Sequence, residues 1–282
     1  MQPPIAEKSP GGLDSTSMSS RRSALIAASL AVAVLAGCGG SPESRQPAAP
    51  AAPSAAPAPP ADVAYVELDS LSDAGSVSGT VTLTGPVPKL QPRPITKDNA
   101  SCGGSEKPNL SLVLGKGNVI ANAVVSLEGI ASGKRFAPSS PVLDQKNCDY
   151  VPYLQIVPAG ATLAIVNSDP VSHNVHAYDA GNESLFNLGT PLAGQRFEQK
   201  LSRPGPVKFK CDVHPWMFAW VWVARTPYTA ATGRDGRFVL DGVPPGTYTL
   251  RVWHELFTEK KVAVTVAPRQ RAAADVTLSL LE

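Results

Sequence analysis

The sequence predicts an all-β protein built as β-sandwiches, and two observations support this fold class. First, short segments that alternate between polar and apolar residues recur from Gly75 onward. The clearest, Ser76 to Leu83, alternates with period two and stops at Gly85-Pro86. Second, the chain carries 28 prolines and 23 glycines, and turn-forming clusters of these residues separate the segments. Beyond the N-terminal region, no segment has the length and periodicity of a long helix.

The other predicted strands are short apolar segments between turn sequences such as Arg234-Asp235-Gly236 and Pro244-Pro245-Gly246. We expect strands at Val119 to Leu127, Tyr153 to Val157, Thr162 to Val166, Val207 to Lys210, Ala219 to Val223, Phe238 to Leu240, Tyr248 to Val252 and Val262 to Val266.

The N-terminus has the pattern of an export signal. Arg21 and Arg22 precede the apolar run Ala24 to Ala36, which is too short to span a bilayer but suits the core of a signal peptide. The run ends in Leu35-Ala36-Gly37-Cys38, which resembles the lipobox of bacterial lipoproteins. We therefore expect residues 1–37 to be a signal peptide and Cys38 to carry the lipid.

Residues 38–72 are rich in proline and alanine, which favours an extended linker over a packed core. The folded part is then expected on the periplasmic side of the cell envelope, attached to the membrane through the lipid. Gly39 stands where an aspartate would signal retention in the inner membrane, which favours the outer membrane.

The charge of the chain gives no reason to expect nucleic-acid binding. Lysine and arginine total 25, aspartate and glutamate total 23, and no basic cluster is visible in the sequence.

The chain has four cysteines, and two of them are expected to form a disulfide. Cys38 is assigned to the lipid and Cys211 lies in a metal-binding motif. Cys102 and Cys148 remain, and outside the cytoplasm such a pair is expected to be oxidised.

The metal-binding motif combines soft and borderline ligands. Cys211, His214 and Met217 follow a predicted strand at intervals of three residues, and His173 follows an earlier predicted strand and turn. A thiolate, two imidazoles and a thioether form the ligand set of copper electron-transfer sites. Zinc would use the cysteine and the histidines but has no use for the methionine.

Two segments carry a resemblance to the cupredoxins, closest to the amicyanin and plastocyanin group. One is the pattern Asn-x-Asp-x-x-x-His-Asn-Val-His at residues 167–176, and the other is Cys-x-x-His-Pro-Trp-Met at residues 211–217. The resemblance covers residues 137–225 and implies a Greek-key sandwich. The segment Asp179 to Lys200 looks like an insertion into this pattern.

The resemblance also implies the roles of the site residues and of the protein. His173, Cys211 and His214 would be equatorial ligands of one type 1 copper, Met217 the axial ligand, and Asn174 a hydrogen-bonding residue that ties the ligand segments together. The protein would be an electron carrier without enzymatic activity. It would exchange electrons with a redox protein through a solvent-facing edge of His214.

The C-terminal residues 226–282 resemble the carboxypeptidase regulatory-like (transthyretin-like) sandwich, through the run Gly233 to Leu240 and the Pro-Pro-Gly-Thr-Tyr turn that follows. The opening strands of that family resemble segments within residues 73–136. Either the cupredoxin region interrupts one such sandwich, or the two domains stand in tandem.

The other aromatic and histidine residues suggest further roles. Trp216 lies in the ligand loop and could contact a partner, whereas Trp220 and Trp222 share one side of a strand and are expected to pack. His176 is expected to be structural, and a second metal site with His254 is the alternative.

Two other functions remain open at this level. A copper storage or delivery protein would usually carry more methionines than the three present here. A structural module that binds another component of the envelope would not need the metal.

Overall fold

The computed structural model describes residues 64–281, and these confirm the all-β prediction. Strands dominate, and the helix α1 (Asn99–Cys102) is a single turn. No helix in this range is long or apolar enough to cross a membrane. The predicted signal peptide, the predicted lipidation site Cys38 and the part of the predicted linker up to residue 63 lie outside the described residues.

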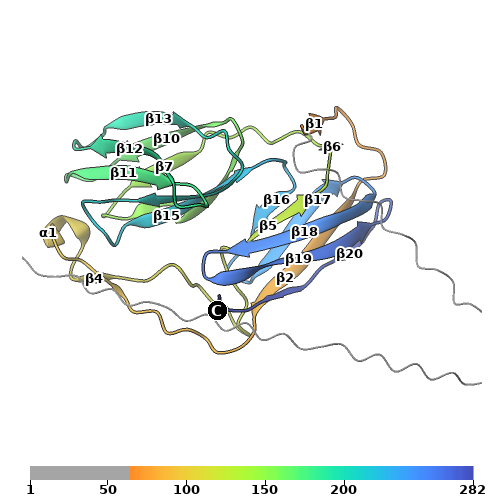
Figure 1. Ribbon diagram of the computed structural model, residues 1–282, viewed down its shortest axis with the longest axis horizontal. Coiled ribbons are helices and arrows are strands. Elements are labelled where there is room, and N and C mark those ends of the chain that lie inside the picture. Colours follow the sequence, from red (N-terminus) through yellow and green to blue (C-terminus); the bar gives the residue numbers. More distant parts are fainter. Residues whose placement is uncertain (1–63, 282) are drawn as a thin grey trace, which may run out of the picture. The chain divides into compact units, whose positions relative to one another are not determined.

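The first sandwich, called sandwich A, consists of two facing sheets (Figure 1). Side chains that point between the sheets are fully buried, among them Phe209, Leu163 and Val175. The five-stranded sheet has the order β12 (Ser184–Thr190), β11 (His173–Tyr178), β14 (Gly205–Lys210), β15 (Phe218–Ala224) and β9 (Leu154–Pro158). The four-stranded sheet has the order β13 (Arg196–Lys200), β10 (Thr162–Asn167), β7 (Val142–Gln145) and β8 (Tyr150–Val151).

The segment Asp179 to Lys200, in which the sequence predicted no strand, contains two strands. It forms β12 and β13, which pair antiparallel with β11 and β10 at the edges of the two sheets. Most side chains of both strands are exposed or half-buried. An edge strand with little buried surface lacks the apolar alternation that marks a strand in sequence.

The second sandwich, sandwich B, combines strands from both ends of the described chain. In Figure 1 the orange β2 and the green β5 lie among the blue C-terminal strands. One sheet has the order β16 (Thr229–Ala231), β5 (Val124–Glu128), β18 (Gly246–His254) and β19 (Phe257–Val266). The other has β2 (Gly75–Leu83) between β17 (Arg237–Val243) and β20 (Arg271–Ala273), with β21 (Val276–Leu278) also paired to β2.

In the sequence, all strands of sandwich A lie between β5 and β16, which are both strands of sandwich B. β5 pairs with β16 in the register Thr229↔Ser126 to Ala231↔Val124. The chain therefore leaves sandwich B after β5, forms sandwich A, and returns beside the strand it left.

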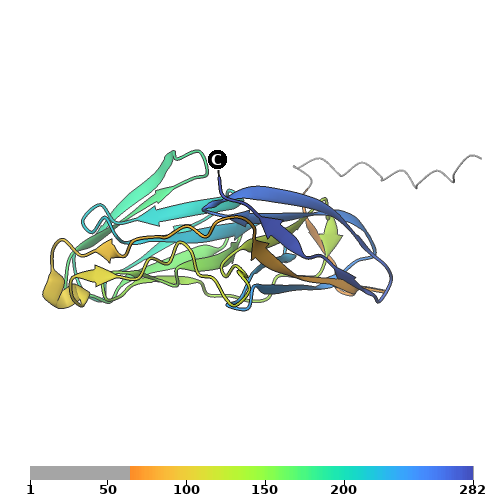
Figure 2. The same ribbon diagram turned by 90° about the horizontal axis from the view of Figure 1, so that it is seen from below.

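A further segment, Arg93 to Lys107, crosses over sandwich A and is called the strap (yellow in Figure 2). Its two ends, β3 (Arg93–Pro94) and β4 (Glu106–Lys107), pair with each other, and α1 lies between them. The disulfide between Cys102 and Cys148, which the sequence predicts, joins the strap to sandwich A. Arg93 adds an ion pair of 3.0 Å with Asp149.

Tryptophans fill the contact between the sandwiches. Trp222 packs in a small buried cluster with Val124 of β5, and the ring of Trp253 lies 5.1 Å from Trp220 and 5.3 Å from Trp222 between centroids. Trp220 and Trp222 thus have packing roles.

His254 is buried at the end of β18, and only 3% of its surface is exposed. Its Nδ1 accepts a hydrogen bond from the N–H of Leu256, and its ring contacts Phe257. Burial lowers the pKa of His254 to about 4, because the charged imidazolium would lose its hydration.

We expect His254→Asn to reduce the acid sensitivity of the fold. The unfolded chain binds a proton at this histidine below about pH 6.5, whereas the folded chain does so only near pH 4. The wild type should therefore lose up to about 3 kcal/mol of unfolding free energy from this group across that window. The measurement is urea unfolding of both proteins at pH 7 and pH 4.5. Burial raises the pKa of the neighbouring Glu255, but this residue is present in both proteins and so does not account for a difference between them. Equal losses for the two proteins would contradict the assignment.

Candidate metal centre

A tight loop between β14 and β15 carries three of the predicted ligands. The N–H of Cys211 donates to the carbonyl of Met217 (3.2 Å), and the N–H of Met217 donates to the carbonyl of His214 (2.9 Å). The N–H of His214 points at the Cys211 sulfur at 3.4 Å. These backbone hydrogen bonds of the loop therefore help to fix the positions of the thiol and the imidazole.

His173 comes from the first residue of β11, which is the sheet neighbour of β14. Alternation along β11 turns His173, Val175 and Ala177 toward the core, so the imidazole faces the loop. Its Nδ1 lies 2.8 Å from the Nδ1 of His214, and each of these nitrogens lies 3.9 Å from the Cys211 sulfur. The structure thus brings three of the predicted ligands together, all of them buried.

Met217, the predicted axial ligand, closes the same loop. Its side chain is fully buried in the core cluster that also contains Cys211. The fourth predicted ligand therefore lies on the inner side of the loop.

Asn174 connects the two ligand segments. Its Oδ1 accepts the N–H of Asp212 at 2.6 Å and lies 3.4 Å from the Cys211 sulfur, while its Nδ2 donates to the Asp212 carboxylate at 2.7 Å. This is the bridging position that the resemblance implied for Asn174.

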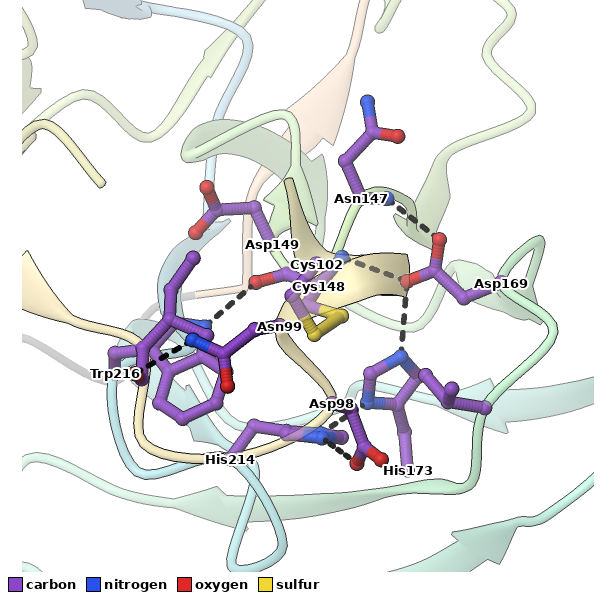
Figure 3. Close-up of a disulfide and its surroundings, with 12 residues drawn as sticks. Asp98, Asn99, Cys102, Asn147, Cys148, Asp149, Asp169, His173, His214 and Trp216 are labelled. Atoms are coloured by element: carbon purple, nitrogen blue, oxygen red, sulfur yellow. Dashed lines mark hydrogen bonds and ion pairs between the residues drawn. A yellow bond between two sulfur atoms is a disulfide. The ribbon is translucent and has the colours of Figure 1, made fainter. Parts of the chain in front are cut away.

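Each ligand histidine also faces a carboxylate, and these two residues were missed in the sequence. Nε2 of His173 lies 2.9 Å from Asp169, and Nε2 of His214 lies 2.9 Å from Asp98 (Figure 3). Asp169 stands four residues before His173 within the recognised motif, so the signal was present. Asp98 is separated from His214 by 116 positions and has no local signal.

The two carboxylates determine how the imidazoles are arranged. Each carboxylate lies where it would accept a proton from Nε2, which is the bond that metal-binding histidines commonly make through their other ring nitrogen. An imidazole with its proton on Nε2 would turn the lone pair of Nδ1 toward the other ring, and the two Nδ1 atoms lie 2.8 Å apart. A proton or a metal cation can bridge such a pair of nitrogens. The donor set therefore fits a metal ion, and its softness fits copper.

Burial sets the charge state of the empty ligands. It lowers the pKa of His173, an effect that the hydrogen bond with Asp169 partly offsets. It raises the pKa of the Cys211 thiol, although surrounding backbone N–H groups act in the opposite direction. A neutral imidazole is ready to bind a cation, and binding must displace the thiol proton.

The expectation that His214 opens to solvent is wrong. Its side chain is 0% exposed, because Asp98 and the strap lie over the edge of the ring. Trp216 is also buried rather than exposed, and its indole N–H donates to the carbonyl of Cys148 at 3.1 Å. Neither side chain is available on the surface for a partner.

The remaining histidines do not join the ligand cluster. Nδ1 of His176 lies 3.0 Å from Asp212 and 2.8 Å from the hydroxyl of Tyr178. Within residues 64–281, neither His176 nor His254 belongs to a group of potential metal ligands.

The fold and the ligand cluster define an all-β protein with a buried cysteine–histidine centre, and comparisons with known proteins are consistent with both predicted resemblances. Residues 214–279 match the family model described as "Carboxypeptidase regulatory-like domain". No curated protein matches the chain.

Among solved structures, a purple cupredoxin from Nitrosopumilus maritimus is similar, with 30% identity over 30% of this chain and 100% of that chain and a TM-score of 0.27. Amicyanin from Paracoccus versutus has 23% identity over 31% of this chain and 85% of that chain, with a TM-score of 0.28. Because these scores are low, the case for a metal site rests on the side-chain geometry.

We expect Asn174→Ala to loosen the ligand loop. Loss of its bonds to Asp212 and the sulfur should increase the alkylation rate of Cys211 in the copper-free protein and weaken copper binding by roughly 10 to 100-fold. Asn187→Ala is the matched control, since Asn187 contacts the Asp212 side chain but not the loop backbone. Equal reactivity of Cys211 in both variants would argue against the role of Asn174.

Proposed function

We propose that the protein is a one-electron carrier that holds one type 1 copper ion through His173, His214, Cys211 and Met217. The observation that supports this most directly is the convergence of two imidazole nitrogens and one cysteine sulfur in a buried site. Copper bound to these ligands would alternate between Cu(II) and Cu(I), which accepts and releases a single electron.

The protein's own contribution is to hold the ligands still. The imidazoles are fixed by Asp169 and Asp98, and the thiol by Asn174 and the backbone of the loop. A thiolate and a thioether suit Cu(I), whereas the imidazoles also suit Cu(II). Ligands that need not move between the two oxidation states keep the barrier to electron transfer low.

The proposed setting follows from the N-terminal sequence. The lipobox at Leu35-Ala36-Gly37-Cys38 supports a lipid anchor at Cys38, with the sandwiches on the periplasmic side and the outer membrane favoured. The partner would be another redox protein, and no enzymatic step is assigned. Labelling of intact cells with radioactive palmitate tests the anchor, and Cys38→Ala should remove the label.

We expect the copper-loaded protein to have an intense thiolate-to-copper absorption in the visible range and the EPR spectrum of a type 1 site. Cys211→Ser should abolish both, because the thiolate provides the charge-transfer band. A colourless Cu(II)-loaded wild type would refute the proposed centre.

Met217 variants should retain the colour and shift the reduction potential. Met217→Leu removes a weak donor to Cu(II) and should raise the potential, whereas Met217→Gln provides an oxygen donor and should lower it. Cyclic voltammetry measures both. If zinc were the physiological ion, zinc affinity would exceed that for Cu(I) in competition, and Met217→Leu would leave it unchanged.

Storage or delivery of copper is the alternative function, and exchange kinetics separate it from electron transfer. A carrier with buried ligands should release Cu(I) to a chelator slowly, whereas a delivery protein should release it readily.

A further inference from the structure

The strap makes a contact with the metal centre that the ligand motifs do not account for. Its Asp98 places Oδ2 at 2.9 Å from Nε2 of His214, whose side chain is 0% exposed, while the Asp98 side chain is itself 39% exposed. Asp98 therefore stands between the imidazole and the solvent. Figure 3 shows the contact between Asp98 and His214, with the disulfide nearby.

The strap is fastened on both sides of Asp98. On one side, the guanidinium of Arg93 donates to the carbonyl of Trp216 (2.6 Å) and to the carboxylate of Asp149 (3.0 Å). On the other side, Cys102 is bonded to Cys148, and both cysteines are 0% exposed. Asp98 itself has a positive φ of 52°, a conformation that the chain holds here at the start of a single helical turn.

The disulfide is also part of the surroundings of the metal ligands. The sulfur atoms of Cys102 and Cys148 and a ring nitrogen of His214 all lie within 4.8 Å of one another. The sulfur of Cys148, a carboxylate oxygen of Asp169 and a ring nitrogen of His173 form a second such group. The N–H of Cys148 donates to Asp169 at 2.7 Å. The covalent link therefore reaches the outer side of both imidazoles.

We propose that the strap is a disulfide-anchored lid on the metal centre, and that Asp98 is the residue of this lid that positions His214. This inference rests on the proposed function for its redox consequences, but the lid itself can be tested without copper. A carboxylate on Nε2 fixes the plane of the ring and makes Nδ1 a stronger donor, which favours Cu(II) over Cu(I). The lid also keeps water and partner proteins from the edge of His214.

The disulfide has a physical reason to be the anchor. The strap alone consists of short pairings and a single helical turn, which gain little from local structure. The 46-residue separation between Cys102 and Cys148 means that the link removes many open conformations of the chain.

The test of the lid is chemical modification of histidine in the copper-free protein by diethylpyrocarbonate, followed by peptide mass spectrometry. Wild-type His214 should react slowly. Its rate should increase in Asp98→Gly, which keeps the disulfide and tolerates the positive φ, and in the double variant Cys102→Ser/Cys148→Ser. In Asp98→Gly, His173 is the internal control, because its partner Asp169 lies outside the strap. Lys97→Ala, an exposed change on the same strap, should behave as wild type.

Two results would overturn the lid: fast modification of His214 in the wild type, or an equal increase in the modification rates of His173 and His214 in Asp98→Gly.

In copper-loaded protein, Asp98→Gly should weaken copper binding by roughly 10 to 100-fold and raise the reduction potential, with Asp98→Asn intermediate. If Asp98→Gly is blue and has the same reduction potential as the wild type, the positioning role of Asp98 is refuted, while the proposed electron-carrier function still stands. A protein that binds no copper yet shows the selective labelling would refute the carrier and leave the lid intact.

Discussion

The side chain of Asn174 joins the two segments that carry the candidate metal ligands. His173 stands at the start of one strand and Cys211 at the end of its neighbour, and the pairing of β11 with β14 brings the two strand ends together. Asn174 then bonds the backbone after Cys211 and approaches its sulfur. Sheet pairing provides the approximate proximity, and the amide fixes the loop.

The parts of the site that could be predicted from the sequence are those encoded locally. Cys211, His214 and Met217 lie within one loop, and His173 and Asn174 are adjacent in a recognisable stretch. Asp98 could not be found in this way, because its bond to His214 depends on a disulfide and an ion pair that bring distant segments together. The expectation of an exposed His214 failed for the same reason, since the strap lies outside the region that resembles cupredoxins.

The strands too could be predicted where their own residues encode them, and were missed where they depend on distant pairing partners. β2 alternates between polar and apolar residues and β10 is a short apolar run, and both strands were predicted within a few residues. The edge strands β12 and β13 bury little and were not predicted as strands. Their pairing partners, rather than their own residues, determine that they are strands.

The return of the chain beside β5 constrains the motion of sandwich A. Two domains joined by one linker can rotate about it, whereas sandwich A enters and leaves through neighbouring strands that share hydrogen bonds. The tryptophans Trp220, Trp222 and Trp253 pack where the chain crosses between the sandwiches. Such a double attachment resists twisting, so a redox centre carried on it would meet its partners in a restricted range of orientations.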